Sequence, residues 1–522
     1  MGKKIKLRRV DIDRRQFLKT IGTGAAAAWA AGTVAAPFTF AAQPADVGPS
    51  DSFHRMFRLP PFAPPTDFIR GALSDMGSVG GLMDAKDDLA KGPVLLITDL
   101  SLSAGNRNNP EHTAGTTFMG QFLDHDMTFD KTSRLGFPTN PIKSANARVP
   151  LFDLDSVYGG GPGYTPELYS VADPIKFKIE SGGLFEDLPR NSAKAAIIGD
   201  PRNDENLMIA GLQAACLKFH NNAVDLVREA TPGISDFDAF FAARQLAVWH
   251  YQWVIMHEFL PLFVGRPLLD SILSGGRKYY RPSAEAYIPV EFQMVYRFGH
   301  SMVRPSYRAN LKGDSGNPFF GMIFQPEGEG QTDPIDLRGG ARAARRFVGW
   351  QTFFKFPNFE ADARPNKRID TKISTPLFNL PLATIFSETP PVSLMTRNLL
   401  RCLTWQVPSG QALAKAMGVT PLGESDLAEL KGFAPSFVSS TPLFYYILKE
   451  AELIEDGMRL GPLGARIVGE IFVGLLQLDG EAYVNVQPNW LPTLPTFAGT
   501  PESFRIIDFL KFAGVDPATR GQ

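Results

Sequence analysis

A short apolar segment of the sequence concentrates groups that can exchange protons or bind a metal. Gln121, Asp124, His125 and Asp126 lie within six positions, between apolar residues on both sides. On a helix, residues four apart share a face, so Gln121 and His125 point the same way and Asp124 lies at the edge of that face. Burying such groups unpaired is costly. A polar cluster in solvent is the simpler alternative, but the apolar neighbours favour a buried functional site.

Three further groups have residue types suited to chemistry, and each also has a simpler explanation. Asp153 and Asp155 flank one leucine, a spacing found in loops and caps as well as in cation sites. Arg202 precedes Glu205 at an expected helix start, where acidic residues are favoured by the helix dipole. His300 lies on an apolar helical segment, where a packed core histidine is more common than a metal ligand.

Taken together and in chain order, five segments resemble those of the animal-type haem peroxidases, the peroxidase–cyclooxygenase superfamily. They span most of the chain that follows the N-terminal arm. The resemblance implies a mainly α fold, a single large helical haem-peroxidase domain with very little β structure. The segments are Gly120–Asp126 (GQFLDHD), Leu151–Gly159 (LFDLDSVYG), Gly199–Asn206 (GDPRNDEN), Tyr296–Ser301 (YRFGHS) and Arg397–Arg401 (RNLLR) with the following Pro408-Ser409-Gly410.

The resemblance implies haem b as a cofactor, with its iron bound from one side, the proximal side, by His300. Gly299 would give the porphyrin room to approach. Asn398 would accept a hydrogen bond from His300 and fix its tautomer. Arg401 would pair with a haem propionate, and Arg297 would lie near the propionates or in the proximal pocket.

On the opposite, distal face of the haem, the resemblance implies that His125 and Arg202 act on the substrate, with Gln121 beside them. Asp124 and Glu205 would lie against two haem edges. In mammalian relatives the matching carboxylates become ester-linked to the haem, so covalent attachment through these two residues is implied here.

The resemblance also implies a calcium site that ties the distal helix to a loop. Calcium binds six to eight oxygen atoms. A threonine is usual where Val149 stands, so one hydroxyl ligand is missing, and a serine is common where Asp155 stands, so a stronger anionic ligand is gained. The implied ligands are the carboxylates of Asp126, Asp153 and Asp155 and the backbone carbonyls of Val149 and Leu151.

The implied activity is the reduction of hydrogen peroxide to water, a reaction of the EC 1.11.1 type. His125 would carry a proton between the peroxide oxygens, and Arg202 would stabilise the charge that develops as the O–O bond breaks. The resulting ferryl haem would oxidise small organic electron donors, halide or thiocyanate. Asn206 stands where one chloride-oxidising relative has a methionine bonded to haem, which argues against efficient chloride oxidation.

Other functions remain open at this point. Superfamily members of the cyclooxygenase type, which are fatty-acid oxygenases, have a radical-forming tyrosine three residues before the proximal histidine; this chain has Arg297 there, and Tyr296 is one position off. A non-catalytic haem-binding or calcium-binding adhesion module is disfavoured, because His125, Arg202 and His300 are all present and no adhesion repeat is visible. A calcium-binding helical protein without haem would lack a Soret absorbance band.

Helical periodicity predicts the elements that must position these groups. We expect residues 46–110 and 140–165 to be loops, the former an arm around the body, and residues 481–486 to form a short strand. No linker divides the chain, so we expect residues 43–110 to be the arm and residues 111–522 to be one domain. The expected helices are 116–127, 205–230, 237–260, 289–303, 393–404, 409–417, 424–431, 442–454 and 461–478.

Composition places the chain among ordinary globular proteins, with 44% hydrophobic and 20% charged residues. The net charge of −1 provides no basic surface for nucleic acid. Cys216 and Cys402 occur in apolar surroundings and favour buried free thiols, although one disulfide remains open. The other histidines are expected to be structural: His54, His112, His220, His250 and His257.

The N-terminus resembles a twin-arginine export signal, with Arg14 and Arg15 followed by Phe-Leu-Lys and an alanine-rich stretch. That stretch is too weakly apolar for a stable membrane span. We therefore expect residues 1–42 to be removed, with the cut near Ala41 or Ala42. The protein would use the twin-arginine export machinery, which carries folded proteins, and would be periplasmic or secreted.

Overall fold

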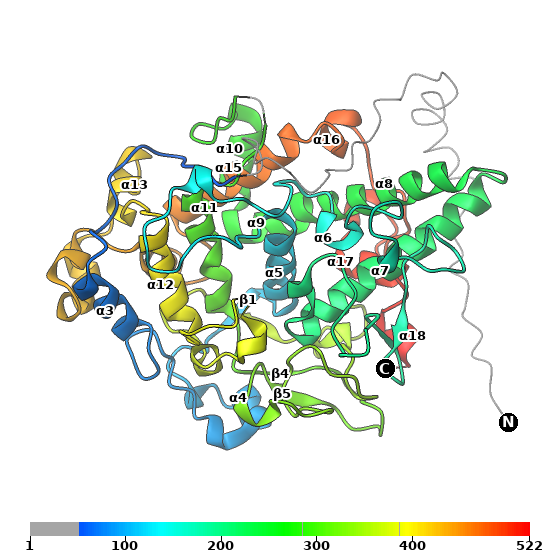
Figure 1. Cartoon of the computed structure of the whole chain (residues 1–522), viewed down its shortest axis with the longest axis horizontal. Helices are drawn as coiled ribbons and strands as arrows, with labels where there is room; N and C mark the ends of the chain where they lie inside the picture. Colours follow the sequence, from blue (N-terminus) through cyan, green and yellow to red (C-terminus); the bar gives the residue numbers. More distant parts are fainter. Residues whose placement is uncertain (1–51, 284, 386, 522) are drawn as a thin grey trace.

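Three long apolar helices meet at the centre of the molecule (Figure 1). The structure is a computed structural model, and it describes residues 52–521 apart from positions 284 and 386. Helix α5 (Gly115–Met127) is buried on nearly all sides and packs against α7 (Leu207–Ala230), which packs along α8 (Asp236–Val254). The predicted signal, residues 1–42, lies outside the described residues.

Side-chain caps fix where the two longest helices begin. Asn206 precedes α7 and its side-chain oxygen accepts from the backbone N–H of Ile209, while Ser235 does the same for Asp238 at the start of α8. The predicted single helix over 237–260 is in fact α8, a π-helical turn η7 (Ile255–Phe259) and α9 (Leu260–Val264).

The predicted helix over 289–303 is divided where the site is built. Helix α11 (Val290–Val295) is followed directly by a 3-10 segment, η8 (Tyr296–Met302), which contains His300. The tighter winding of a 3-10 segment stacks side chains three apart. Arg297 and His300 are three positions apart, so η8 brings both side chains to one side of the segment.

The remaining helical predictions are confirmed within a residue or two, and mainly helical architecture is the observed fold. The other α-helices are α3 (Asp67–Met76), α4 (Gly92–Thr98), α6 (Asp155–Tyr158), α10 (Arg266–Gly275), α12 (Leu394–Thr404), α13 (Gly410–Ala416), α14 (Leu443–Ile454), α15 (Pro462–Leu478), α16 (Tyr483–Val486), α17 (Ile506–Phe512) and α18 (Pro517–Arg520). The predicted helix at 424–431 is instead 3-10 in character, as η13 (Glu424–Gly432).

Three sequence-based expectations for local structure are wrong. The predicted loop at 140–165 contains the short helix α6. The arm at 46–110 contains α3 and α4 as well as loops. The predicted strand at 481–486 is the helical turn α16. Asn485 explains that turn, because its side chain donates to the backbone carbonyls of Leu476 and Asp479 and folds the segment back onto the end of α15.

The β structure of the described residues consists of three two-stranded antiparallel ribbons. The ribbon β1–β6 is the one nearest to the site, because β1 leads into α5 and β6 contacts η8. The strands are β1 (Asn108–Thr113) with β6 (Pro365–Lys367), β2 (Glu180–Ser181) with β3 (Glu186–Asp187), and β4 (Ser306–Arg308) with β5 (Phe320–Met322).

Arg304, just after η8, fastens this ribbon to the proximal segment. It is completely buried and donates to the backbone oxygens of Asn106, Pro365 and Asn366 and to the side-chain oxygens of Asn106 and Asn108, at 2.6–3.1 Å. Burial lowers the pKa of Arg304 to about 10, so the guanidinium stays charged at neutral pH.

Replacing Arg304 with methionine should destabilise the fold by at least about 3 kcal/mol, because several buried acceptors lose their donor at once. Urea denaturation followed by circular dichroism measures the change. Arg308→Met is the matched control: that arginine pairs with Asp362 and both side chains are about one-third exposed, so its loss should cost less than about 1 kcal/mol. Equal losses for the two variants would contradict the assignment.

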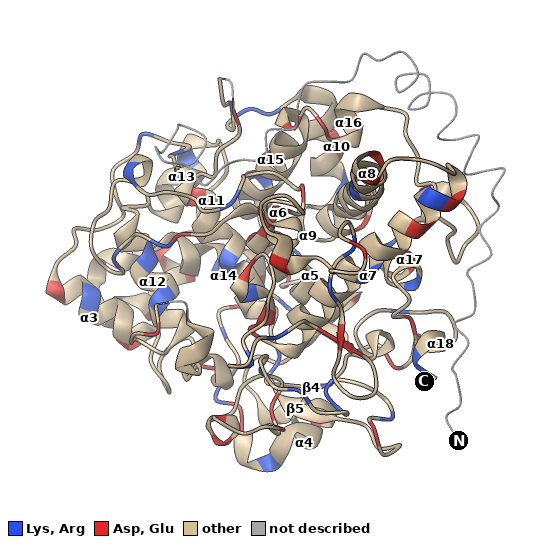
Figure 2. Ribbon diagram, turned by 45° about the vertical axis from the view of Figure 1, so that its right-hand side comes forward, with Lys and Arg blue, Asp and Glu red and all other residues tan. Residues whose placement is uncertain are grey.

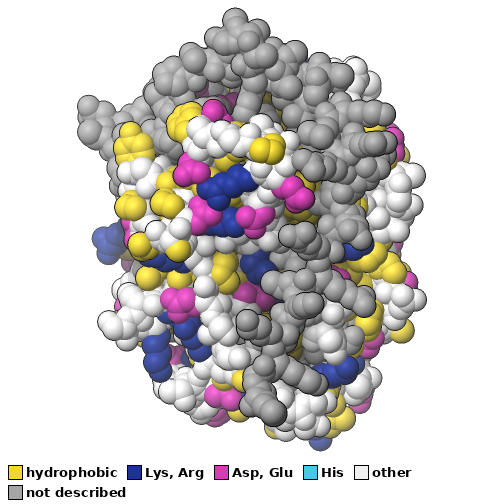
Figure 3. Space-filling view, turned by 90° about the vertical axis from the view of Figure 1, so that its right-hand side faces the viewer, with side chains coloured by type: hydrophobic (Ala, Val, Ile, Leu, Met, Phe, Trp, Pro, Cys, Tyr) yellow, Lys and Arg dark blue, Asp and Glu magenta, His cyan; other side chains and the backbone are white. Residues whose placement is uncertain are grey.

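The two thiols agree with the sequence-based expectation. Basic and acidic side chains alternate over the molecule, and the face shown in Figure 3 has no extended basic area among its coloured residues (Figures 2 and 3). Cys216 and Cys402 are both buried and free. None of the described helices has the length and apolar character that crossing a bilayer demands.

Candidate functional site

The distal group is assembled from α5 and the turn before α7, η6 (Pro201–Asp204). His125 is 4% exposed; its Nδ1 lies 2.8 Å from Oδ1 of Asn203 and its Nε2 lies 4.0 Å from a carboxyl oxygen of Glu205. Burial, helped by the charge of Arg202, lowers the pKa of His125 to about 3. The imidazole is therefore neutral at physiological pH and can accept a proton.

Arg202 is held beside the distal histidine by fixed acceptors. It donates to both carboxyl oxygens of the fully buried Asp200, at 3.1 and 2.8 Å, and to the backbone oxygen of His125 at 3.0 Å. Its guanidinium also lies 4.0 Å from the centre of the Phe129 ring. Burial disfavours the Asp200 carboxylate, but the charges of Arg202 and Arg148 outweigh it and keep the pKa of Asp200 below its usual range.

Three further predicted residues lie next to this pair. Gln121 donates from Nε2 to Glu205 at 3.0 Å, and its amide oxygen accepts from Asn206 at 3.2 Å. Burial raises the pKa of Glu205 to about 8, although 24% of its side chain remains accessible. Burial also raises the pKa of Asp124. Both carboxyl groups thus line an interior space that is poor in solvating partners.

The proximal group joins η8 to α12. His300 Nδ1 lies 2.7 Å from Nδ2 of Asn398, and Arg297 donates to Oδ1 of Asn398 at 3.1 Å. The contact between His300 and Asn398 is the expected one, but its polarity is reversed. A guanidinium has only donors, so it takes the amide oxygen and leaves the amide NH₂ facing the imidazole. Burial, with Arg297 and then His125, lowers the pKa of His300 to about 3.

Arg401 has a protein partner that the sequence did not predict. It donates to Asp130 at 2.6 Å, and the hydroxyl of Ser133 is also in contact. Arg297 remains less well satisfied, since its Nε has no hydrogen-bond partner among the described residues. Burial and the charge of Arg401 lower the pKa of Arg297 to about 10. This group of cations is suited to a dianionic ligand such as the two propionates of haem.

The two histidines come from distant parts of the chain, but the helix that carries His125, α5, packs against η8, which carries His300. A side chain built on Gly299 would meet no atom within 4 Å, so there is open space beside His300. With a neutral imidazole on each side, two carboxyl groups at the edge and a partly unpaired arginine, the residues present fit a haem group.

Near the distal helix, three carboxylates converge as the sequence predicted. One oxygen each from Asp126, Asp153 and Asp155 lies within 4.8 Å of the others. Burial and mutual repulsion raise the pKa of Asp126 and of Asp155, and Oδ1 of Asp155 is buried without a hydrogen-bond partner. Arg148 and Arg244 offset part of this negative charge. The donor set is all oxygen, which fits a hard cation such as Ca²⁺.

Of the two predicted carbonyl ligands, Val149 is already engaged. Its oxygen accepts from the backbone N–H of Leu151 at 2.8 Å, and its own N–H donates to Asp155 at 3.1 Å. A carbonyl has a second lone pair, so this bond does not prevent coordination. Asp126 also accepts from the hydroxyls of Ser156 at 2.9 Å and Tyr251 at 3.2 Å, which hold it against the loop.

Sequence reasoning missed the residues that orient the distal group, namely Asp200, Asn203 and Gln213. Asp200 and Asn203 stand in the turn that carries Arg202, but nothing in their local pattern distinguishes them from capping residues.

The remaining histidines are packed as expected: His250 bonds to the backbone of Leu246 and Thr493, and His257 stacks on Trp253. No described histidine belongs to a metal-binding cluster.

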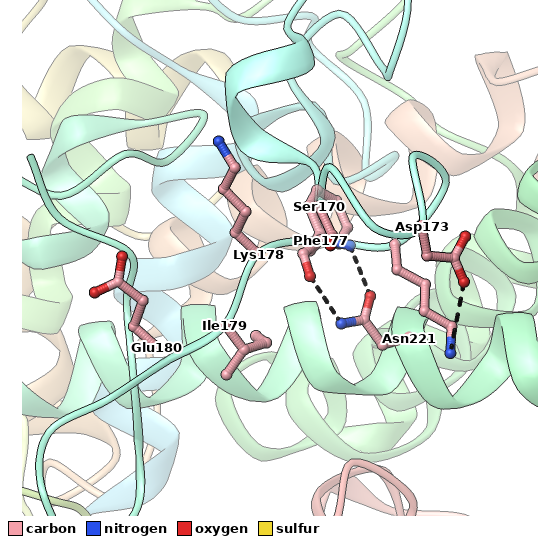
Figure 4. Close-up of a pocket in the computed structure, with 8 residues that line it drawn as sticks. Ser170, Asp173, Phe177, Lys178, Ile179, Glu180 and Asn221 are labelled. Carbon is pink, nitrogen blue, oxygen red and sulfur yellow. Dashed lines mark hydrogen bonds and ion pairs between the residues drawn. The ribbon is translucent and has the colours of Figure 1, made fainter.

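A separate hollow of about 390 Å³ lies between α7 and the loop before β2 (Figure 4). Its polar side chains are engaged within the protein. Asn221 bonds both backbone groups of Phe177, Asp173 pairs with Lys176 and Arg228, and Lys178 donates to the backbone oxygen of Glu167. It contains none of the predicted site residues.

Comparison with known proteins indicates the same family as the sequence motifs. The family model described as animal haem peroxidase matches residues 132–328, which include Arg202, Glu205, Arg297 and His300 but not His125. The chain is 31% identical to the peroxidase mlt-7 of Caenorhabditis elegans over 225 residues, 38% of this chain and 29% of that protein. It is 31% identical to the dual oxidase of Drosophila melanogaster over 110 residues, 21% of this chain and 7% of that protein.

The matched segments thus span less than a third of these curated relatives. Solved structures extend the likeness over most of the chain. Peroxidase A from Dictyostelium discoideum superposes with a TM-score of 0.55 at 18% identity, over 78% of this chain and 85% of that one. The Oryza sativa fatty acid alpha-dioxygenase superposes with a TM-score of 0.53 at 15% identity, over 78% and 73%. At such low identity these structures establish the fold alone. The family match over residues 132–328 and the fold over most of the chain agree, and together they identify an animal haem peroxidase domain in this chain.

Proposed function

We propose that this protein binds haem b between His300 and His125 and uses it to reduce hydrogen peroxide to water at the expense of small electron donors. The observation that carries the proposal is that α5, with His125, packs against η8, with His300, while Arg202 is fixed beside His125. The family match over residues 132–328 supports the haem and the peroxidase class, whereas the donor is inferred from the chemistry of the site.

Bound haem would supply the redox chemistry of O–O cleavage. His300 would bind the iron through the lone pair of Nε2, which requires its proton on Nδ1. The amide of Asn398 would then turn to present its oxygen to Nδ1 and hold the ring in place, the reverse of its orientation in this structure. Arg297 would balance propionate charge, and Arg401 would add to it if its pair with Asp130 opens.

His125 would take the proton from the peroxide oxygen nearest the iron and return it to the outer oxygen, which leaves as water. Its Nε2 is free for this role, because Nδ1 is engaged by Asn203. Arg202 would donate to the negative charge that develops as the bond breaks. Gln121 would hold Glu205 in place. Asp124 and Glu205 would be the residues ester-linked to the haem, as the matching carboxylates are in mammalian relatives.

An optical spectrum of the haem-loaded protein, followed by titration with hydrogen peroxide and a phenolic donor, tests the proposal. We expect a Soret band that changes on addition of peroxide and peroxide-dependent oxidation of the donor. Iodide, bromide and thiocyanate can be compared in the same assay. A protein that takes up no haem, or takes it up without turning over peroxide, would refute the proposed function.

A fatty-acid oxygenase is the second candidate, because alpha-dioxygenases are among the proteins of similar fold. The local structure argues against the cyclooxygenase type. Arg297 occupies the position three residues before His300, and the hydroxyl of Tyr296 donates to the backbone oxygen of Gly120. Oxygen uptake with linoleate but no peroxide turnover would reverse the preference.

We also propose that Asp126, Asp153 and Asp155 bind Ca²⁺ and thereby hold α5 in register with the loop before α6. Removal of calcium by EGTA should lower the free energy of unfolding by about 2.7 kcal/mol if calcium was present at 100 times its Kd. Thermal unfolding with and without EGTA measures this, and the Soret band reports on the distal helix.

Asp155→Asn should abolish the effect of EGTA, because it removes one anionic ligand. Asp173→Asn is the matched control: Asp173 pairs with Arg228 outside the cluster, so that variant should keep the full response. An unchanged melting temperature and spectrum in EGTA would exclude a structural calcium ion at this site.

The twin-arginine motif at Arg14 and Arg15 leads us to propose export of the folded protein to the periplasm or the medium. Cell fractionation of the full chain and of a variant with both arginines replaced by lysine tests this. Equal export of the two would contradict it.

A further inference from the structure

Two buried amides form a chain that ends on the distal histidine. Asn203 in η6 lies with its Oδ1 2.8 Å from Nδ1 of His125, and its Nδ2 donates to Oε1 of Gln213 at 2.8 Å. Both amide side chains are completely buried, and Gln213 projects from α7, a different element from the one that carries Asn203.

We propose that Asn203 and Gln213 are positioning residues that select the tautomer of His125. A neutral imidazole has one N–H, and its position depends on what the other partner can offer. Gln213 takes the NH₂ of Asn203, so Asn203 presents only its oxygen to the ring. The proton must then be on Nδ1, and Nε2 keeps its lone pair. The inference rests on the proposed function, because the lone pair is what a peroxide proton needs.

The geometry places that lone pair on the side of the site. Nε2 is the nitrogen that lies 4.0 Å from Glu205, which in turn contacts Gln121. The opposite tautomer would direct an N–H toward the same space and could accept nothing. Arg202 precedes Asn203 directly, so one turn of chain delivers both the charge-stabilising donor and the residue that orients the base.

Burying the amide of Gln213 costs free energy that its packing alone does not explain. Its Nε2 is buried and has no hydrogen-bond partner in the part of the chain that the structure describes. A leucine would fill the same volume without burying an unpaired donor. The polar side chain is accounted for if its task is to fix the direction of the Asn203 amide.

Cyanide binding to the haem-loaded ferric protein tests the inference without turnover. Hydrogen cyanide gives its proton to Nε2 of His125 while cyanide binds the ferric iron, so the association rate reports on the free lone pair. Asn203→Leu should slow association at least about tenfold. This is only part of the ~10²–10⁴-fold contribution of a positioned base, because His125 itself is still present. Asn203→Asp, whose side chain accepts but cannot donate, should stay within about threefold of the unmodified chain.

Two variants of Gln213, which lies on α7, repeat this comparison on a different element from Asn203. Gln213→Glu can only accept from Asn203 and should preserve the rate, whereas Gln213→Leu should slow it. In a His125→Ala background, Asn203→Leu should have no further effect, because it acts through His125. These comparisons separate orientation from general damage to the fold, which the Soret band and melting temperature monitor.

Unchanged cyanide association in Asn203→Leu, failure of Asn203→Asp to preserve it, or an equal loss in the His125→Ala background would overturn the inference. Should Asn203→Leu not fold, the two Gln213 variants decide in the same way. A chain that binds no haem at all refutes the proposed function, and the inference falls with it. Haem binding with identical rates in every variant refutes the inference alone.

Discussion

Replacing His300 with alanine should abolish peroxide turnover and displace the Soret band, because His300 is the proposed ligand of the haem iron. The pKa of His300 is lowered to about 3, so the ring offers a neutral nitrogen at physiological pH. The open space beside Gly299 would give a porphyrin room to approach the ring. We expect the rate of donor oxidation to fall by at least about 10³-fold, the scale at which loss of an essential group is usually felt.

Free imidazole provides the control for this variant. The alanine leaves a cavity of the ring's own size, so added imidazole should restore part of the Soret position and of the activity. Asn398→Leu should give a milder result, since it keeps the ligand but removes the amide that contacts it at 2.7 Å. A His300→Ala protein with the unmodified spectrum and rate would show that the iron is bound elsewhere.

The helices that build the site were predictable because local signals coincide in them. α7 has an Asn206 cap and a long apolar period, and α5 combines apolar residues with the polar group of Gln121–Asp126. The convergence of Asp126, Asp153 and Asp155 was predictable by resemblance, because the loop residues are close in sequence to α5. In each case the information lies within one short segment or in a recognised motif.

What the sequence did not predict depends on contacts between distant segments. The pairing of Arg401 with Asp130 joins residues 271 positions apart. The Asn203–Gln213 chain requires η6 to fold over α7, and neither residue stands out locally. The reversed amide of Asn398 follows from Arg297 on another element. Polarity and pairing of buried groups emerge only when the packing is known.

The helix α3 shows the opposite case: its sequence has a helical pattern, but the loop-like composition around it led to the prediction of a loop. Thr66 caps it and Ile69, Ala72, Leu73 and Met76 recur with helical spacing, and all four are buried. The Pro, Gly and Asp around it gave the segment the composition of a loop. Periodicity is the better guide, because burial of one face stabilises a short helix more than composition opposes it.

Replacing His125 with alanine should lower kcat/KM for hydrogen peroxide by about 10²–10⁴-fold while leaving the haem in place. His125 is anchored at Nδ1 by Asn203 and its Nε2 is left free, so its loss would remove the proposed proton carrier and spare the proposed iron ligand. The expected signature is a normal Soret band in a protein that responds slowly to peroxide. Stopped-flow absorbance after mixing with peroxide measures the change directly.

His257→Ala is the matched control, because that histidine stacks on Trp253 outside the site and its imidazole is not part of the proposed proton path. It should react with peroxide at the rate of the unmodified chain. Arg202→Met should lose about 10²–10³-fold, since it removes one preorganised donor while His125 remains. If His125→Ala and His257→Ala react equally fast, another group must carry the proton. Glu205 would be the next residue to replace, because it lies 4.0 Å from Nε2 of His125 and its raised pKa, about 8, lets it gain and lose a proton near neutral pH.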